Sequence, residues 1–164
     1  MKHRQEERSA PSRPHVLPIE ELVHPWPLLA VVVLALNDHW LKGAGLLPGW
    51  VTGKLSDVAG LFFFPLLLTA VSRVASRLLR HPDALTRRRL GVAIALTAAA
   101  FTAIQLWPAA AGAYEWLMPR LDPTGLVRQV RVTMDPADLL ALPALLLTWL
   151  HGRRFFEAAP PDRP

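Results

Sequence analysis

The chain contains no cysteine among its 164 residues, and it has a single tyrosine. The absence of cysteine excludes disulfide bonds, thiol catalysis and cysteine-ligated metals. Familiar catalytic signatures are also missing, because the sequence has no HExxH, GxSxG or phosphate-binding GxxxxGK motif. The first apolar segment runs into Leu-Asn-Asp-His-Trp without a small-x-small cleavage site, so we expect it to be retained rather than removed as a signal peptide.

Apolar residues make up 52% of the sequence and are concentrated in four blocks, at 24–42, 56–73, 90–107 and 136–151. Each block approaches the length of about 20 residues that a helix needs to cross a membrane. The six tryptophans all lie at or outside the ends of these blocks, where interfacial tryptophans are expected. We therefore predict an all-α, polytopic membrane protein with four transmembrane helices in a compact bundle. A soluble bundle with unusually apolar helices is the alternative.

The chain carries a net charge of +5, which could indicate binding to nucleic acid. The distribution of its 18 Lys and Arg residues argues against this, because 13 of them flank the helices on one predicted side and five on the other. By the positive-inside rule, both termini lie in the cytoplasm, and the basic clusters contact anionic lipid. We predict a disordered cytoplasmic tail at 1–23, a transmembrane domain at 24–152 and a second cytoplasmic tail at 153–164.

The second and fourth blocks share the phrase DxAxLxxxPxLL, which begins at Asp57 and again at Asp135. This similarity predicts an internal repeat, in which two helices enter the membrane with the same polarity. The phrase also places prolines at Pro65 and Pro143, and we expect each to kink its helix. A proline frees the backbone carbonyl four residues earlier, and inside a bilayer that carbonyl needs another partner. The long connection 108–134 predicts a surface helix at 109–118 and a brief strand at 126–132.

The polar residues within or beside the four helices are predicted to reach the outer side of the membrane. A bundle would bring these helix ends together into a shallow, outward-facing pocket. The candidate catalytic residues are Asp38, Asp57, Asp138 and His39, and the candidate binding residues are Asn37, Lys54, Ser56, Gln105 and Asp135.

Several of these residues also have local interpretations. Asp135 precedes a proline, a pattern typical of a helix N-cap, and Ser56 or Asp57 could cap the second helix in the same way. Asp138 lies in the first turn of its helix, where the helix dipole favours a carboxylate. Gln105 could form a hydrogen bond between helices.

Asp38 is harder to explain locally, because it lies at the outgoing end of the first helix, where the dipole disfavours a carboxylate. Pairing with Lys42, four residues later, is the structural interpretation. A functional site is the other, since ionisable groups near the hydrocarbon boundary are costly. His39 follows directly and is either an interfacial aromatic residue or a ligand or proton carrier.

Carboxylates and an imidazole in one pocket can hold a divalent cation, or act as a general acid and base if burial separates their pKa values. Lysines and helix N-terminal amides would favour an anionic headgroup. The sequence therefore indicates a membrane protein that binds or processes an envelope lipid or a lipid-linked precursor. A non-enzymatic scaffold or assembly partner is the alternative, in which the same residues cap and cross-link helix ends. A small transporter is disfavoured, because no acid lies at mid-membrane depth.

The phrases LNDHWLK, TGKLSDVAGLFFFPLLL and DPADLLALP resemble an uncharacterised group of bacterial four-helix membrane proteins. A KxxD element at 54–57 and an arginine followed by DxxD, ending at Asp138, resemble the VanZ-like family of small polytopic proteins associated with glycopeptide resistance. Asp57 stands where that family is expected to have a histidine, and no NxxxG follows Asp138. The resemblance covers 37–72 and 131–146. It implies a bacterial inner-membrane location, and the VanZ-like element implies an envelope or lipid-linked role.

Overall fold

The fold is given by a computed structural model that describes residues 19–41, 44–45, 47–81, 84–122 and 130–156, without the side chains of Asp38 and His39. Every secondary-structure element in the described part of the chain is helical, which confirms the all-α prediction. Its elements are α1 (Pro25–Leu36), the π-helical turn η1 (Asn37–Leu41), α3 (Gly49–Leu78), α4 (Arg87–Leu106), α5 (Pro108–Leu121), the 3₁₀ helix η2 (Pro136–Ala141), α6 (Ala144–Gly152) and the 3₁₀ turn η3 (Arg153–Phe155). The helices α3 and α4 are long and apolar enough to cross a membrane.

The second helix begins earlier than the sequence predicts, at Gly49 rather than at residue 56. Pro48 occupies its N-cap position, so Lys54, Ser56 and Asp57 lie within the helix. The interpretation of Ser56 or Asp57 as a helix cap is therefore wrong. The two glycines at the start of α3 made this stretch resemble a loop, because glycine disfavours helix interiors.

The other predicted segments also differ from the structure in detail. The first ends in the π-helical turn η1, and the fourth begins as the 3₁₀ helix η2, with a turn at Leu142 and Pro143 before α6. The surface helix predicted at 109–118 is present as α5. The strand predicted at 126–132 is absent from its described part, residues 130–132, where the Val132 amide donates to Glu115 Oε1 at 2.7 Å. Residues 126–129 lie outside the described part.

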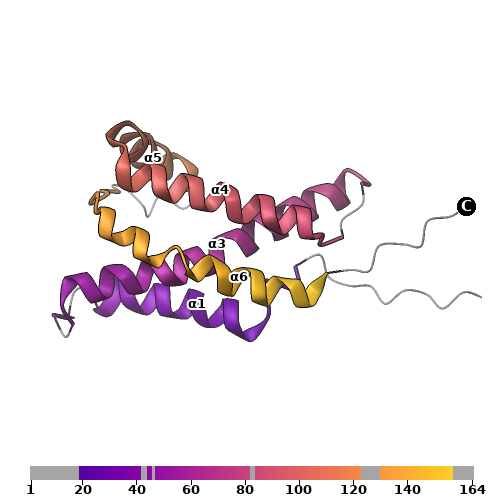
Figure 1. The fold of residues 1–164 in the computed structure, drawn as a ribbon, viewed down its shortest axis with the longest axis horizontal. Helices are drawn as coiled ribbons and strands as arrows, with labels where there is room; N and C mark the ends of the chain where they lie inside the picture. The colour runs from indigo at the N-terminus through magenta and orange to yellow at the C-terminus, as the bar shows by residue number, and fades with distance from the viewer. Residues whose placement is uncertain (1–18, 42–43, 46, 82–83, 123–129, 157–164) are drawn as a thin grey trace, which may run out of the picture.

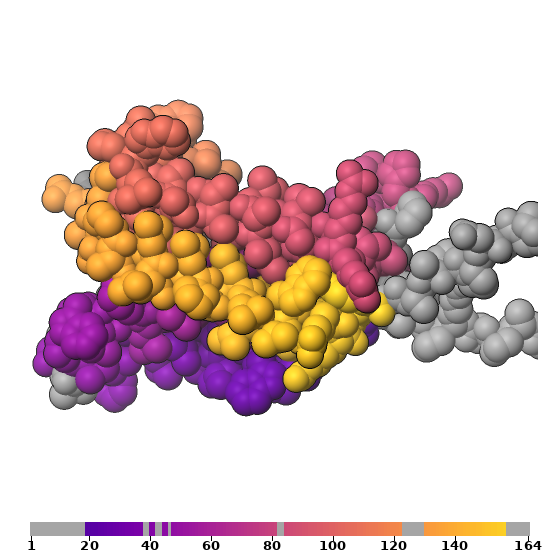
Figure 2. Space-filling view, in the orientation of Figure 1, coloured from indigo at the N-terminus to yellow at the C-terminus, as the bar shows by residue number. Residues whose placement is uncertain are grey.

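Helix α3 is central, since α1, α4 and α6 all pack against it. Asn37, just after α1, bonds to Thr52 near the start of α3, whereas Glu21, before α1, pairs with Arg73 near the end of α3. Helix α1 therefore runs antiparallel to α3. Arg89, at the start of α4, bonds to Ser76 near the end of α3, so α4 also runs antiparallel to α3. The η2–α6 segment runs parallel to α3, the polarity that the repeated phrase predicts. Figure 1 shows α5 at the end of the bundle where α4 finishes, and Figure 2 shows the η2–α6 segment lying along α4.

The carbonyl group freed by Pro65 has a hydrogen-bond donor on a neighbouring helix. The Thr148 hydroxyl, on α6, lies 3.3 Å from Leu61 O, 3.1 Å from Phe62 O and 3.4 Å from Ala144 O of its own helix, so these three acceptors share its single proton. Thr148 and Pro65 are both fully buried, so water does not supply this bond from outside the bundle. The Thr148 hydroxyl on α6 thus offers a hydrogen bond to Leu61 O, which has no amide donor at position 65 of α3.

Small and polar residues form much of the interior of the bundle, whereas many large apolar residues point outward. Leu28, Val32 and Leu36 of α1 and Leu96 of α4 are about half exposed or more, at 49%, 50%, 51% and 59%. The buried apolar residues are mainly alanines, namely Ala30, Ala59, Ala70, Ala93, Ala111, Ala141 and Ala144, with Leu61, Leu66, Leu85, Leu90 and Leu145. Small residues at helix contacts and polar side chains between helices are typical of membrane proteins.

Replacing Thr148 by valine is expected to lower the free energy of unfolding by about 1 kcal/mol, because the Leu61 carbonyl loses its side-chain donor. Thr148→Ser keeps the hydroxyl and should cost less. In a Pro65→Ala background the new amide at position 65 can bond to Leu61, so Thr148→Val should cost less there. Unfolding in detergent micelles measures all four variants. An equal cost in both backgrounds would contradict the assignment.

Candidate functional site

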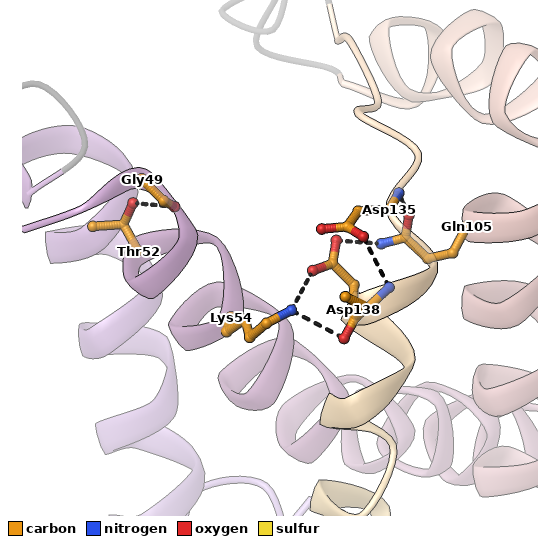
Figure 3. Close-up of polar contacts among 7 residues, drawn as sticks. Gly49, Thr52, Lys54, Gln105, Asp135 and Asp138 are labelled. Atoms are coloured by element: carbon orange, nitrogen blue, oxygen red, sulfur yellow. Dashed lines mark hydrogen bonds and ion pairs between the residues drawn. The ribbon is translucent and has the colours of Figure 1, made fainter.

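A polar network joins α3, α4 and η2 at the end of the bundle where α4 finishes (Figure 3). The Lys54 ammonium reaches from α3 to η2, where it lies 2.9 Å from Asp138 Oδ1 and 3.0 Å from Ala137 O. Gln105, near the end of α4, donates from Nε2 to Asp138 Oδ2 at 3.0 Å. The Asp135 amide donates in turn to Gln105 Oε1 at 3.2 Å. Three segments distant in sequence are therefore linked through one carboxylate.

Asp135 begins η2 as an N-cap, because its Oδ1 accepts a hydrogen bond from the Ala137 amide at 2.8 Å. This confirms the local interpretation of Asp135. The cap also fixes the first turn of η2, in which Asp138 points toward Lys54 and Gln105 (Figure 3). The role of Asp135 in the network is thus to position Asp138 and to supply its own backbone amide.

A second polar contact lies on a different face of α3. Asn37, fully buried in η1, donates from Nδ2 to Thr52 O and to Ser56 Oγ, both at 2.6 Å. Residues 54 and 56 point about 200° apart on an α-helix, so Ser56 faces α1 while Lys54 faces η2. The candidate residues therefore form two separate groups, with Asn37 and Ser56 in one and Lys54, Gln105, Asp135 and Asp138 in the other.

Asp57, Asp38 and His39 are the other three candidates. Asp57 is half-buried, and its carboxylate is close enough to interact electrostatically with the Lys54 ammonium. The side chains of Asp38 and His39 lie outside the described part. Among the residues that the structure describes, no group of three acidic or histidine side chains could hold a metal ion.

The Lys54 network is closed upon itself, since both oxygens of Asp138 and both polar atoms of the Gln105 amide are bonded within it. Gln105 is 6% exposed, whereas the side chains of Lys54 and Asp138 remain 31% and 18% exposed. A closed network of this kind cross-links helices. Its partly exposed cation can also contact an anionic group that arrives from outside the bundle.

A further polar cluster, which the sequence did not predict, lies toward the opposite end of α1 and α6. Glu21, which was assigned to the cytoplasmic tail, is fully buried and pairs with Arg73 of α3, which was counted among the charges that set the topology. The Thr69 hydroxyl also lies 3.4 Å from Glu21 Oε1. Burial raises the pKa of the Glu21 carboxyl, and the Arg73 guanidinium opposes that rise. An acid adjoining the apolar Leu22 and Val23 was the signal that could have revealed it.

The same cluster includes two histidines. His151 of α6 lies with Nε2 at 3.0 Å from Glu21 O, and because a carbonyl only accepts, Nε2 carries the proton. The His24 ring packs edge-on against His151, with their centroids 4.9 Å apart. Through these contacts, the residues before α1, Glu21 and His24, pack against both α3 and α6.

Comparison with known proteins gives no relative from which a function could be transferred: no family model matches the chain, and no curated protein or solved structure is significantly similar to it.

Replacing Gln105 by leucine should lower the free energy of unfolding by about 1–3 kcal/mol, because Asp138 loses a charge-assisted hydrogen bond and the Asp135 amide loses its acceptor, both in a partly buried place. Leu106, the next residue, is 49% exposed, and Leu106→Ala is the control that should change stability little. Thermal unfolding in detergent compares the two. If Gln105→Leu lowered the free energy of unfolding no more than the control, the hydrogen bonds of Gln105 would not stabilise the bundle.

Proposed function

We propose that this chain is an integral protein of the bacterial inner membrane that crosses it with four segments and keeps both termini in the cytoplasm. Its outward-facing polar network acts as a clamp that holds the segments together, so the protein serves as a non-enzymatic scaffold or assembly partner. The observation that carries the membrane assignment is the distribution of side chains, with many leucines and valines exposed and with alanines, polar residues and five leucines inside. In water such a surface would be an aggregation hazard, whereas in a bilayer it faces lipid.

The four segments would be α1 with η1, then α3, α4, and η2 with α6. The two composite segments, 25–41 and 136–152, have 17 residues each, the lower limit of about 17–25 for a crossing helix. Pro65 and Pro143 would bend the second and fourth segments. Exposed tryptophans support the boundaries, because Trp26 lies at one end of α1 and Trp40, Trp50, Trp107 and Trp116 lie near the other end of the bundle.

The clamp is supported by the completeness of its pairing. In a low-dielectric environment each unpaired polar group is costly, so Lys54, Gln105 and Asp138 stabilise the bundle only when all three are bonded. They connect α3, α4 and η2 in this way. The Lys54 ammonium is bonded to Asp138, and both oxygens of Asp138 are occupied within this network, so the geometry favours a structural role over a catalytic one.

A second candidate function is the binding of a headgroup from an envelope lipid or lipid-linked precursor at the same network. The partial exposure of Lys54 favours it, because a cation at the interface can contact a phosphate without leaving Asp138. The resemblance of 54–57 and 131–138 to VanZ-like elements points in the same direction.

The absence of cysteine allows a direct test of topology, because each single-cysteine variant carries one thiol only. His81, between α3 and α4, and Ala113, in α5, are both exposed. In intact cells, a membrane-impermeant maleimide should label Ala113→Cys but label His81→Cys only after permeabilisation. Labelling of both variants in intact cells, or recovery of the protein from the soluble fraction, would contradict the proposed topology.

Exchanging the charges of the clamp separates the two candidate functions. Lys54→Glu and Asp138→Lys should each lower the unfolding temperature, since each places two like charges together. The double variant restores an opposite-charge pair and should recover much of the loss. If the network is only a clamp, the double variant should recover both its stability and its cellular phenotype. A headgroup site predicts that stability recovers while the phenotype does not. If the double variant is no more stable than either single variant, the clamp is not supported.

A further inference from the structure

An apolar groove of about 470 Å³ lies between α1, α3 and α6. Its lining includes two small side chains, Ala30 and Ala59, whose size leaves room between the helices. Leu29, Val58 and Leu147 are among the larger apolar residues that flank it. The groove is distinct from the clamp, because neither Lys54 nor Asp138 lines it.

The polar residues of the lining, His151 and Arg154, occur at one end of the groove, on the last turn of α6 and on η3. The Nε2 proton of His151 is already committed to Glu21 O, whereas Arg154 is exposed. Trp26 lines the same end, because the residues just before α1 pack on His151. An otherwise apolar groove thus ends at a cation and an exposed indole.

We propose that this groove binds one acyl chain of an anionic phospholipid from the surrounding membrane, with the lipid phosphate at Arg154. The proposal rests on the membrane location proposed above, which places Arg154 at the cytoplasmic surface. Basic residues beside grooves between transmembrane helices on that side complement anionic headgroups. The volume also falls in the range of about 300–1,000 Å³ that is common for small-ligand sites.

The size of the groove favours a lipid chain over a helix from a partner protein. The lining of the groove spans Trp26–Val33 on α1 and Leu55–Phe62 on α3, which at a rise of about 1.5 Å per residue is about 10 Å, or about two helical turns. A stable helix–helix contact extends over several turns. A single flexible hydrocarbon chain can bind without a contact that extends over several helical turns.

Trp26 provides a reporter inside the site. In a chain whose other five tryptophans are changed to phenylalanine, Trp26 fluorescence is measured in phosphatidylcholine vesicles that contain increasing fractions of phosphatidylglycerol, with one of the two lipids brominated. Brominated phosphatidylglycerol should quench more strongly than brominated phosphatidylcholine at equal mole fraction. The ratio of their association constants should be about three to five, as expected for one partly exposed ion pair.

Arg154→Gln should bring this ratio close to one. Arg153→Gln removes the same charge one residue away, outside the lining, and should leave most of the preference. Val58→Phe narrows the groove and should also reduce the ratio. Native mass spectrometry of the unaltered chain and of Arg154→Gln, which needs no tryptophan replacements, should show one retained phosphatidylglycerol in the former and its loss in the latter.

Equal quenching by both lipids in the chain with native arginines, or an equal effect of the two arginine variants, would overturn the proposal, because either result describes ordinary lipid contact or diffuse surface charge. These outcomes are distinguishable from failure of the membrane assignment. If the cysteine labelling gives the expected topology while the lipid ratio is one, only the lipid site is rejected.

Discussion

Hydrogen bonds from neighbouring segments to α3 are the contacts on which the arrangement of this bundle depends. Asn37 bonds to the first turns of α3, Thr148 to its middle and Glu21 to Arg73 near its far end. Lipid tails are as apolar as leucine, so apolar side chains gain little by leaving lipid for a helix contact. Close packing at alanines and hydrogen bonds between polar groups then determine which helices pack together and at which positions along α3.

Much of this architecture could be predicted from composition and spacing. The all-helical class, the limits of α4 to within three residues and the N-cap at Asp135 follow from local sequence patterns. The need for a donor opposite Pro65 also follows, because a proline always removes one amide from a helix. The identity of that donor could not be predicted, since Thr148 lies 87 positions after Leu61 and looks like an ordinary residue of an apolar helix.

The errors came from interpreting polar and flexible residues by their local sequence. Gly49 and Gly53 suggested a loop, yet they begin α3, because the helical turns that follow are bonded and packed against α1 and η2. Glu21 was assigned to a tail for its charge, although its burial is compensated by an arginine 52 positions away. Residues that are close in sequence can also point in nearly opposite directions on a helix, so Ser56 and Lys54 face different neighbours.

The two polar clusters differ in a way that bears on what each can do. The Glu21–Arg73 pair is fully enclosed, and removing one partner would leave an isolated charge in the interior, so it acts as a fixed anchor. The Lys54–Asp138 pair retains contact with the surroundings and can exchange part of its bonding with an external group. Of the two pairs, only the Lys54–Asp138 pair is accessible to the headgroup that the second candidate function requires. The Glu21 end instead holds α1 and α6 in the positions that leave the apolar groove between them open.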